Sequence, residues 1–354
     1  MTTKLQQKYE AVMLASAIGD TLGMPVESMK KEQIQKYTGG ITEPIDAVLV
    51  KDEHGQLIKK DEFGPLKYWT RDLKKGEYTD DTYSAKAIAE ALLEKGTNLE
   101  YITQRQVDIF NALKQPDGHI KGAWGGSTRI AFENINSGIS PLEAGAENGI
   151  GTGPPMKMAP VGLYMHANLY HSSLPKLARN IGLTTHKDER AIAAGIVQAD
   201  LVYRLLDDNI SRDQFIDYAI NSAKTNELPF DQTFIPEKGN ITSKLEWIKE
   251  NKNVSDDKAH EFLRSGSLVL EAYPFTIFMF QKYFDKPFKG LLKTINFGGD
   301  CDTTGAMFGA LAGARHGYFF PEKWLEVLQD AKELKELGQE IYEIDKWRRE
   351  CVDR

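Results

Sequence analysis

Apolar residues recur with helical spacing along most of the chain. Between residues 4 and 18, Leu5, Tyr9, Val12, Met13 and Ser16 fall on one face of a helix. Similar stripes predict helices near 82–95, 101–114, 128–137, 156–170, 189–207, 211–224, 242–251, 267–284 and 302–316. The stretch 321–347 carries many charged i,i+4 neighbours and predicts one or two surface helices.

Strand signals are few. The best lies at 47–60, where two short apolar runs flank an Asp-Glu-His-Gly turn and predict a small β-hairpin inserted in a loop. Strands and helices do not alternate, which argues against a doubly wound fold. No internal repeat and no Pro/Gly/Ser-rich linker divides the chain. The pattern therefore predicts an all-α fold, a compact helical bundle that forms a single domain over residues 1–354.

Composition narrows the class of protein. The 354 residues include 51 Asp and Glu against 44 Lys and Arg, for a net charge of −7, so nucleic acid is a poor default partner. Two cysteines cannot form a disulfide scaffold. No apolar run approaches the roughly 20 residues that span a bilayer, and the first residues lack the pattern of a signal peptide. We therefore expect a cytoplasmic protein with no membrane partner.

Thr79, Asp80 and Asp81 stand at the start of a predicted helix. They suit an N-cap, because Thr and Asp accept hydrogen bonds from first-turn N–H groups and acids favour the positive end of the dipole. They also suit a hard cation, because two adjacent carboxylates repel each other and Mg²⁺ or Mn²⁺ prefers oxygen ligands. The residues alone leave both interpretations open.

A second acidic cluster, Asp300, Asp302 and Thr303, opens another predicted helix. The preceding Gly298 and Gly299 allow a close backbone approach or a positive φ. Within the helix, glycines recur every four residues from 305 to 317, which predicts tight packing against neighbouring helices. Capping remains an alternative here too. Together the two clusters could bridge two ions that lie close to each other.

The end of the first helix and the loop that follows it contain Asp20 and Glu27. The glycines and proline between them are typical of a helix end followed by a turn. Asp20 is unfavourably placed for the dipole of its own helix, which indicates a role beyond capping. Glu27 is a candidate carboxylate on a mobile loop.

A Gly-rich loop at 149–157 leads into a predicted helix. Its backbone N–H groups could form an anion cradle, with Lys157 adding charge, but a plain interhelical turn has the same composition. No Ser or Thr follows Lys157, so the loop is not a Walker P-loop. His186, near the start of a later helix, is expected to be neutral because the helix dipole opposes a positive charge there.

Six segments together resemble the ADP-ribosylglycohydrolase family, which includes the dinitrogenase-reductase-activating glycohydrolase and the ADP-ribosylarginine and ADP-ribosylserine hydrolases. In the family's order and spacing, they are GDTLGMPVE, KGEYTDDT, GGSTRIAF, GTGPPMKMAP, TTH and GGDCDTTGAMFGALAGARHG. Each segment is weakly specific alone, and the joint pattern is highly specific.

The resemblance implies an all-α fold with a cleft that holds two divalent cations, Mg²⁺ or Mn²⁺. The metal ligands that it implies are Thr79, Asp80, Asp81, Asp300, Asp302 and Thr303, with Asp302 as the ligand that bridges both ions. The ADP-ribose site that it implies comprises Gly149, Gly151, Thr152, Gly153, Met156, Lys157 and His186. Its implied catalytic residues are Glu27, Asp80 and Asp302. Tyr164 and Phe132 are alternative candidates to stack on adenine.

Three positions depart from the family's pattern. Thr152 stands where the family usually has Asn, and Lys157 where it usually has Arg. Nucleotide contacts are expected to differ there, because an ammonium is a point charge and a guanidinium is a planar fork. Cys301 replaces the usual Thr between two aspartates, and its side chain is expected to point away from the metals.

The resemblance implies a hydrolase that removes ADP-ribose from a mono-ADP-ribosylated protein, with the arginine N-glycosidic linkage favoured over the serine O-glycosidic one. Its partners would be ADP-ribose and the modified protein, and a monomer is expected. Two alternatives remain: a module that binds ADP-ribose without cleaving it, and a scaffold that blocks a partner transferase. A broken set of metal ligands would favour the first alternative, and here the set is complete.

Overall fold

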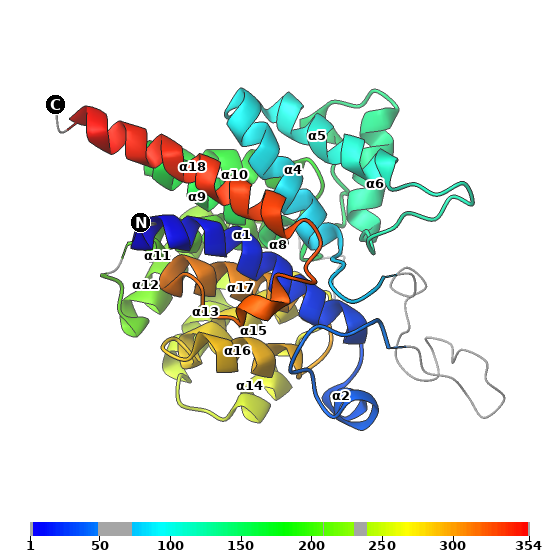
Figure 1. The fold of residues 1–354 in the computed structure, drawn as a ribbon, viewed down its shortest axis with the longest axis vertical. Helices are drawn as coiled ribbons and strands as arrows, with labels where there is room; N and C mark the ends of the chain where they lie inside the picture. Colours follow the sequence, from blue (N-terminus) through cyan, green and yellow to red (C-terminus); the bar gives the residue numbers. More distant parts are fainter. Residues whose placement is uncertain (1–2, 49–72, 208, 230–238, 353–354) are drawn as a thin grey trace.

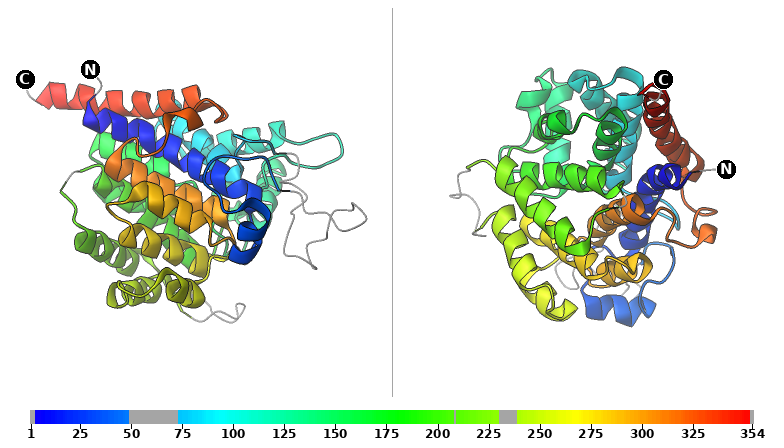
Figure 2. Two further views of the ribbon diagram at one scale, coloured as in Figure 1. Left: turned by 60° about the horizontal axis from the view of Figure 1, so that its bottom comes forward. Right: turned by 90° about the vertical axis from the view of Figure 1, so that its left-hand side faces the viewer.

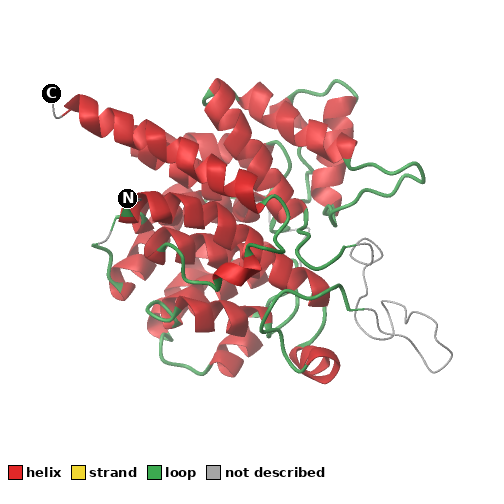
Figure 3. Ribbon diagram, in the orientation of Figure 1, coloured by secondary structure: helices red, strands yellow, loops and turns green. Residues whose placement is uncertain are grey.

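The computed structural model describes residues 3–48, 73–207, 209–229 and 239–352, whose regular elements are helices joined by loops (Figures 1 and 3). The α-helices are α1 (Lys4–Gly23), α2 (Lys31–Thr38), α4 (Asp80–Lys95), α5 (Leu99–Ala112), α6 (Gly126–Asn136), α7 (Pro141–Ala144), α8 (Gly153–Met156), α9 (Ala159–Asn168), α10 (Leu174–Leu183), α11 (Glu189–Leu205), α12 (Arg212–Asn226), α13 (Ile241–Glu250), α14 (Asp256–Leu263), α15 (Val269–Lys282), α16 (Pro287–Ile295), α17 (Cys301–His316) and α18 (Ala331–Val352). Short 3-10 helices span Met24–Val26, His171–Ser173 and Glu322–Trp324.

α1 and α17 pack together at the centre of the bundle. From Lys8 to its end, every residue of α1 is buried, so the helix is enclosed on all sides and not only along its predicted apolar stripe. α18 packs along α1, while α11, α15 and α16 pack on α17. Even Lys8 is buried, with its ammonium donating to the backbone oxygens of Leu205 and Leu206 at the end of α11 (3.1 and 2.8 Å).

Four glycines, which we call the glycine seam, bring the backbones of α1 and α17 into direct contact. They are Gly19 on α1 and Gly305, Gly309 and Gly313 on α17. A Cβ atom on Gly305 would lie 2.4 Å from the backbone oxygen of Gly19, and one on Gly309 would lie 2.0 Å from that of Ala15. No larger residue fits without moving a helix. The tight packing predicted from the glycine spacing is confirmed.

The other helices surround this pair. α4, α5 and α6 lie on one side of it, and α12 to α16 lie on the other (Figures 1 and 2). The N- and C-termini lie at the same end of the bundle (Figure 2). α1 runs away from that end and α17 runs back toward it, so the end of α1 and the start of α17 meet at the opposite end.

The all-α prediction is confirmed. The predicted run 156–170 is divided between α8 and α9, with a break at Lys157–Met158 and Pro160 in the first turn of α9, where proline is tolerated. The predicted hairpin at 47–60 falls almost entirely outside the described residues. Within the described residues, no helix combines the length and apolarity needed to cross a bilayer.

Candidate functional site

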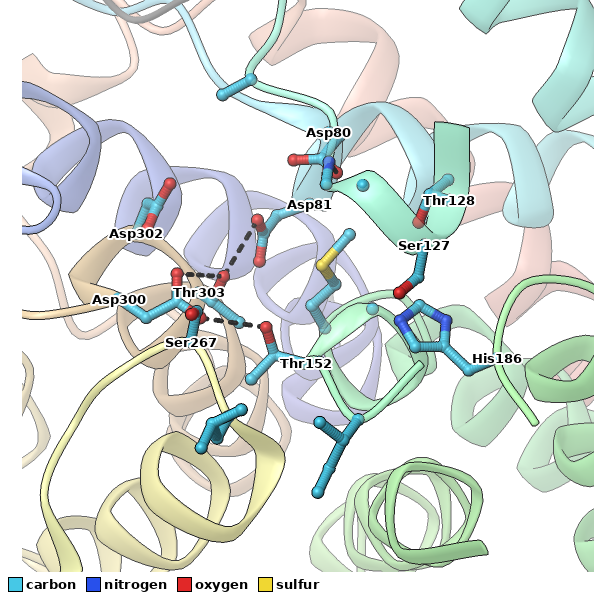
Figure 4. A pocket seen from close by; sticks show the side chains of 18 of the residues that line it. Asp80, Asp81, Ser127, Thr128, Thr152, His186, Ser267, Asp300, Asp302 and Thr303 are labelled. Carbon is cyan, nitrogen blue, oxygen red and sulfur yellow. Dashed lines mark hydrogen bonds between the residues drawn. The ribbon is translucent and has the colours of Figure 1, made fainter. Parts of the chain in front are cut away.

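A cavity of about 290 Å³ lies where the end of α1 meets the start of α17. The N-terminal ends of α4, α6, α8, α15 and α17 contribute to its wall (Figure 4). Because helix N-termini carry partial positive charge, this convergence favours anionic groups inside the cavity. Its lining residues are Glu27, Asp80, Asp81, Ala123, Gly125, Gly126, Ser127, Thr128, Asn148, Ile150, Gly151, Thr152, Gly153, Met156, His186, Ser267, Leu268, Asp300, Asp302 and Thr303.

Asp20 positions the first acidic cluster from the neighbouring helix α1. Its fully buried carboxylate accepts hydrogen bonds from the backbone N–H groups of Thr79 (3.0 Å) and Thr82 (3.2 Å). It also lies within hydrogen-bond distance of both threonine hydroxyls, at 2.9 and 2.6 Å. Asp20 thus satisfies the first turn of α4, which carries Asp80 and Asp81. This is the role beyond capping that its place in the sequence indicates, and burial raises its pKa to about 6.

The capping interpretation of the first cluster is confirmed for Thr79, and the cation interpretation stays a prediction for Asp80 and Asp81. Thr79 is the N-cap of α4, and its hydroxyl accepts from the N–H of Asp81 (3.4 Å). Thr79 is fully buried and is not part of the cavity wall, whereas Asp80 and Asp81 are. One carboxylate oxygen of Asp80 accepts a hydrogen bond from the N–H of Gly125, at the start of α6 (3.2 Å).

The second cluster lies where α17 begins. Gly298 and Gly299 have positive φ values of 77° and 75°, and a Cβ on either would lie within about 2 Å of a backbone oxygen, so both reasons predicted for glycine here are confirmed. Asp300 is the N-cap residue of α17, but its side chain makes no capping hydrogen bond. Instead it accepts from the hydroxyls of Thr152 (2.9 Å) and Thr303 (3.3 Å). The Asp300 carboxylate thus faces the cavity and not the helix backbone.

Glu27 is held against the second cluster by its own backbone neighbours. The N–H of Ser28 donates to Gly299 O, and the N–H of Gly299 donates to Met29 O (2.9 Å). Ser28 adopts a left-handed conformation, with φ of 68°, which turns the chain at this point. The Glu27 side chain is buried and lines the cavity.

The structure brings Glu27 together with the aspartates of the second cluster, and Thr303 joins that cluster to Asp81. Oxygens of Glu27, Asp300 and Asp302 lie within 4.8 Å of one another, near the roughly 4 Å that separates opposite ligands of one Mg²⁺ ion. Thr303 Oγ links the clusters, at 3.3 Å from both Asp81 and Asp300. Burial, followed by the negative charges of Asp20 and Asp302, raises the pKa of Asp81 well above its usual range.

This acidic group fits a divalent cation. Among the described residues, Asp81 Oδ1 is buried and has no hydrogen-bond partner, which is costly for a carboxylate oxygen unless something else binds it. Its neighbours supply carboxylate and hydroxyl oxygens, the ligand types that Mg²⁺ and Mn²⁺ prefer. A cation would also offset the burial of charge and the mutual repulsion that together raise the pKa of Asp81.

The Gly-rich loop forms the part of the wall next to the second cluster, where Thr152 contacts Asp300, and it encloses His186. It is tied to the start of α15 by a hydrogen bond from the N–H of Val269 to Ile150 O (2.9 Å). A Cβ on Gly153 would lie 2.3 Å from the His186 ring, so glycine is required for this approach. Burial, and next the charge of Lys157, lowers the pKa of His186 to about 3. His186 is therefore neutral, as predicted, chiefly because it is buried.

Two residues assigned to the ADP-ribose site do not line the cavity: Gly149 and Lys157. Lys157 is buried behind the loop, where burial lowers its pKa to about 7. The two candidates for adenine stacking are also absent from the wall. Phe132 is fully buried in an aromatic cluster with Phe110 and Trp124. Cys301 Sγ contacts Gly23 O (3.3 Å) on α1, away from the acidic group.

The cavity wall also contains residues for which the sequence predicts no individual function. Gly125 to Thr128 begin α6, and Ser267 and Leu268 precede α15. Gly125 to Thr128 form the GGST part of a segment that resembles the family, directly before a predicted helix. This position could have identified them as wall residues. Ser267 carries no comparable signal, because only tertiary packing brings it to the loop.

Comparison with known proteins gives a consistent result. The family model described as ADP-ribosylglycohydrolase matches residues 1–350. An uncharacterized protein of Archaeoglobus fulgidus is 28% identical over 344 residues, which are 96% of this chain and 97% of that protein. The ADP-ribosylhydrolase ARH3 of Danio rerio is 23% identical over 95% of this chain and 90% of its own. A solved structure described as an ADP-ribosylglycohydrolase-related protein complex has a TM-score of 0.68 and 25% identity, with 97% of this chain and 99% of that chain covered.

Proposed function

The chain belongs to the ADP-ribosylglycohydrolase family of glycosyl hydrolases, and we propose that it removes ADP-ribose from a modified protein side chain. The linkage that we favour is the N-glycosidic bond to arginine, with the O-glycosidic bond to serine as the second candidate. The observation that carries the proposal is the position of two acidic clusters and a Gly-rich loop around one cavity.

Two divalent cations, Mg²⁺ or Mn²⁺, are the cofactors that we propose. Asp80, Asp81, Asp300, Asp302 and Thr303 would hold them. When bound, such ions supply positive charge that orients ribose hydroxyl groups and lowers the pKa of a water molecule. The unpartnered oxygen of Asp81 supports this assignment.

The protein would bind the diphosphate through the Gly-rich loop and the helix N-termini of the cavity wall. Their N–H groups and partial positive charges suit phosphate oxygens. Binding energy gained there positions the ribose, whose anomeric carbon reacts at the acidic end of the cavity.

The reaction breaks the bond between the anomeric carbon and the side-chain nitrogen or oxygen. The transition state has oxocarbenium character, which nearby carboxylates stabilise by their negative charge. Water adds to the anomeric carbon, a carboxylate of Asp302 or Glu27 accepts a proton from it, and the leaving side chain takes up a proton. The products are ADP-ribose and the unmodified protein.

Defined peptides test the proposal. Arginine-, serine- and glutamate-linked ADP-ribosyl peptides are each incubated with the enzyme in Mg²⁺ or Mn²⁺, and free ADP-ribose is measured. We expect the arginine peptide to be cleaved fastest. Asp302→Asn is expected to retain the fold and lose activity by orders of magnitude. Asp213→Asn is the matched control, because Asp213 is exposed and pairs with Lys252 on the surface.

Two results would count against the proposal. If Asp302→Asn releases ADP-ribose at the wild-type rate in either metal, the mechanism is wrong. If the wild-type protein binds ADP-ribose in calorimetry but cleaves none of the peptides, the chain is a binding module.

A further inference from the structure

A chain of hydrogen-bonded polar side chains leads from behind the Gly-rich loop to the cavity: Lys157, Thr185 and His186. The Lys157 ammonium donates a hydrogen bond to Thr185 Oγ (3.0 Å), and Thr185 Oγ lies 2.9 Å from His186 Nδ1. All three side chains are buried. Buried polar groups of this kind must satisfy one another, so the direction of each hydrogen bond can be determined.

Thr185 has one hydroxyl proton and two nearby acceptors. An ammonium has no lone pair, so Thr185 Oγ accepts from Lys157 and keeps its own proton to donate. The backbone oxygen of Gly182 lies 3.3 Å away but already accepts the N–H groups of Thr185 (3.1 Å) and His186 (3.0 Å). His186 Nδ1 is closer, at 2.9 Å, and the two backbone N–H groups already occupy both lone pairs of the Gly182 oxygen. The proton of Thr185 therefore points to Nδ1.

A neutral imidazole that accepts at Nδ1 carries its proton at Nε2. A Cβ on Gly153 would be 3.0 Å from Nε2 and 3.2 Å from Nδ1, so the loop covers the ring, and Nε2 is the ring nitrogen that also lies next to Gly151, 3.5 Å from a Cβ there. Both glycines line the cavity, as does His186 (Figure 4). The ring edge that faces the ligand side is therefore a hydrogen-bond donor.

We propose that Lys157 and Thr185 are positioning residues that fix His186 as the Nε2–H tautomer, so that the ring donates a hydrogen bond to an anionic oxygen of the ligand. The reversed tautomer would present a lone pair to that oxygen and repel it. The identity of the ligand, ADP-ribose, rests on the proposed function, whereas the tautomer rests only on contacts within the protein.

Nuclear magnetic resonance reads the tautomer directly. Protein labelled with ¹⁵N-histidine is measured through two-bond ¹H–¹⁵N correlations at pH 6, between the pKa values of His186 (about 3) and Lys157 (about 7). The chain has seven histidines, and the His186→Asn spectrum identifies the signals of His186. We expect Nδ1 to be unprotonated and Nε2 to carry the proton. A protonated Nδ1 in the wild-type protein overturns the proposal without any variant.

Matched variants test the role of Thr185. Thr185→Val removes the hydroxyl with little change in shape, and Thr185→Ser retains it. We expect Thr185→Val to populate the Nδ1–H tautomer and to raise the Kd for ADP-ribose about tenfold, the effect of one hydrogen bond to a charged group. We expect Thr185→Ser to restore both readouts. If Thr185→Val keeps the wild-type tautomer and Kd, Thr185 does not position the ring.

The two proposals fail in different ways. A wild-type protein with the Nε2–H tautomer that neither binds ADP-ribose nor releases it refutes the proposed function and leaves the tautomer assignment intact. A protein that cleaves ADP-ribosyl peptides but shows the Nδ1–H tautomer refutes the positioning role alone.

Discussion

Asp20→Ala is the substitution that most directly tests how the first acidic cluster is positioned. In the native structure, the Asp20 carboxylate satisfies the N–H groups of Thr79 and Thr82 and contacts their hydroxyls. Alanine leaves both N–H groups buried and without this acceptor. The Thr79 hydroxyl can turn to Asp81 Oδ2 at 3.1 Å, so it need not stay unsatisfied.

The expected loss of stability follows from the two amide groups. A buried donor left without a partner costs about 1–3 kcal/mol, so two cost about 2–6 kcal/mol. Removing a buried charge offsets part of this, since burial raises the pKa of Asp20 to about 6. We expect the free energy of unfolding to fall by about 2–4 kcal/mol, which a domain of typical stability survives.

The effect on catalysis is expected to be larger than the effect on the fold. The first turn of α4 carries Asp80 and Asp81, and a displacement of roughly 1 Å in a reacting geometry can cost on the order of 100-fold in rate. Urea unfolding and the release of ADP-ribose from a modified peptide measure the two effects. Asp20→Asn keeps one acceptor oxygen and is expected to lie between wild type and Asp20→Ala in both. Wild-type stability together with a wild-type rate in Asp20→Ala would refute this account.

Three further outcomes are expected. Gly309→Ala places a methyl group 2.0 Å from Ala15 O and should lower the free energy of unfolding by about 1–3 kcal/mol in urea titrations; an unchanged midpoint would show that the helices separate at no cost. The pKa of His186 is about 3 when folded and about 6.5 when unfolded, so the unfolded chain binds more protons between these values and stability falls as the pH drops below 6.5. His186→Asn should therefore lose about 2 kcal/mol less than wild type between pH 7 and pH 5, and equal losses would contradict the assigned pKa. Mg²⁺ or Mn²⁺ at 100 times its Kd should stabilise the wild-type protein by about 2.7 kcal/mol and so raise its Tm. Asp81→Asn should lose most of this gain. If neither metal nor EDTA changes the Tm of the wild-type protein, the cation site is excluded.

Local sequence patterns predicted the long helices well and the short ones poorly. α1, α11 and α17 contain several turns of periodic apolar or small residues, enough for the helical period to stand out. α2 and α14 have eight residues each, little more than two turns. α14 packs on the longer helix α15, and a local pattern does not record tertiary contacts of this kind, which stabilise short helices.

The sequence likewise predicted part of the candidate site and missed the contacts that support it. Asp80, Asp300 and the Gly-rich loop stand in compact segments whose composition points to chemistry, and the fold brings them to one cavity. The positions of Asp20 and Lys157 could be read from the sequence, but their partners could not. Asp20 meets Thr79 from 59 residues away, and Lys157 meets Thr185 from 28 residues away. Contacts of this kind depend on the tertiary structure.

The glycine seam also determines how far apart the two acidic clusters can be. Gly19 immediately precedes Asp20, which orients the first cluster, and Gly305 stands less than one turn after Asp302 in the second. Most helix pairs are held 8–10 Å apart by a layer of side chains that can repack. At the seam the backbones touch, so there is no such layer to yield. The seam therefore keeps the distance between the two clusters constant. Substitutions elsewhere in the bundle should change the stability of the protein more readily than the spacing of its carboxylates.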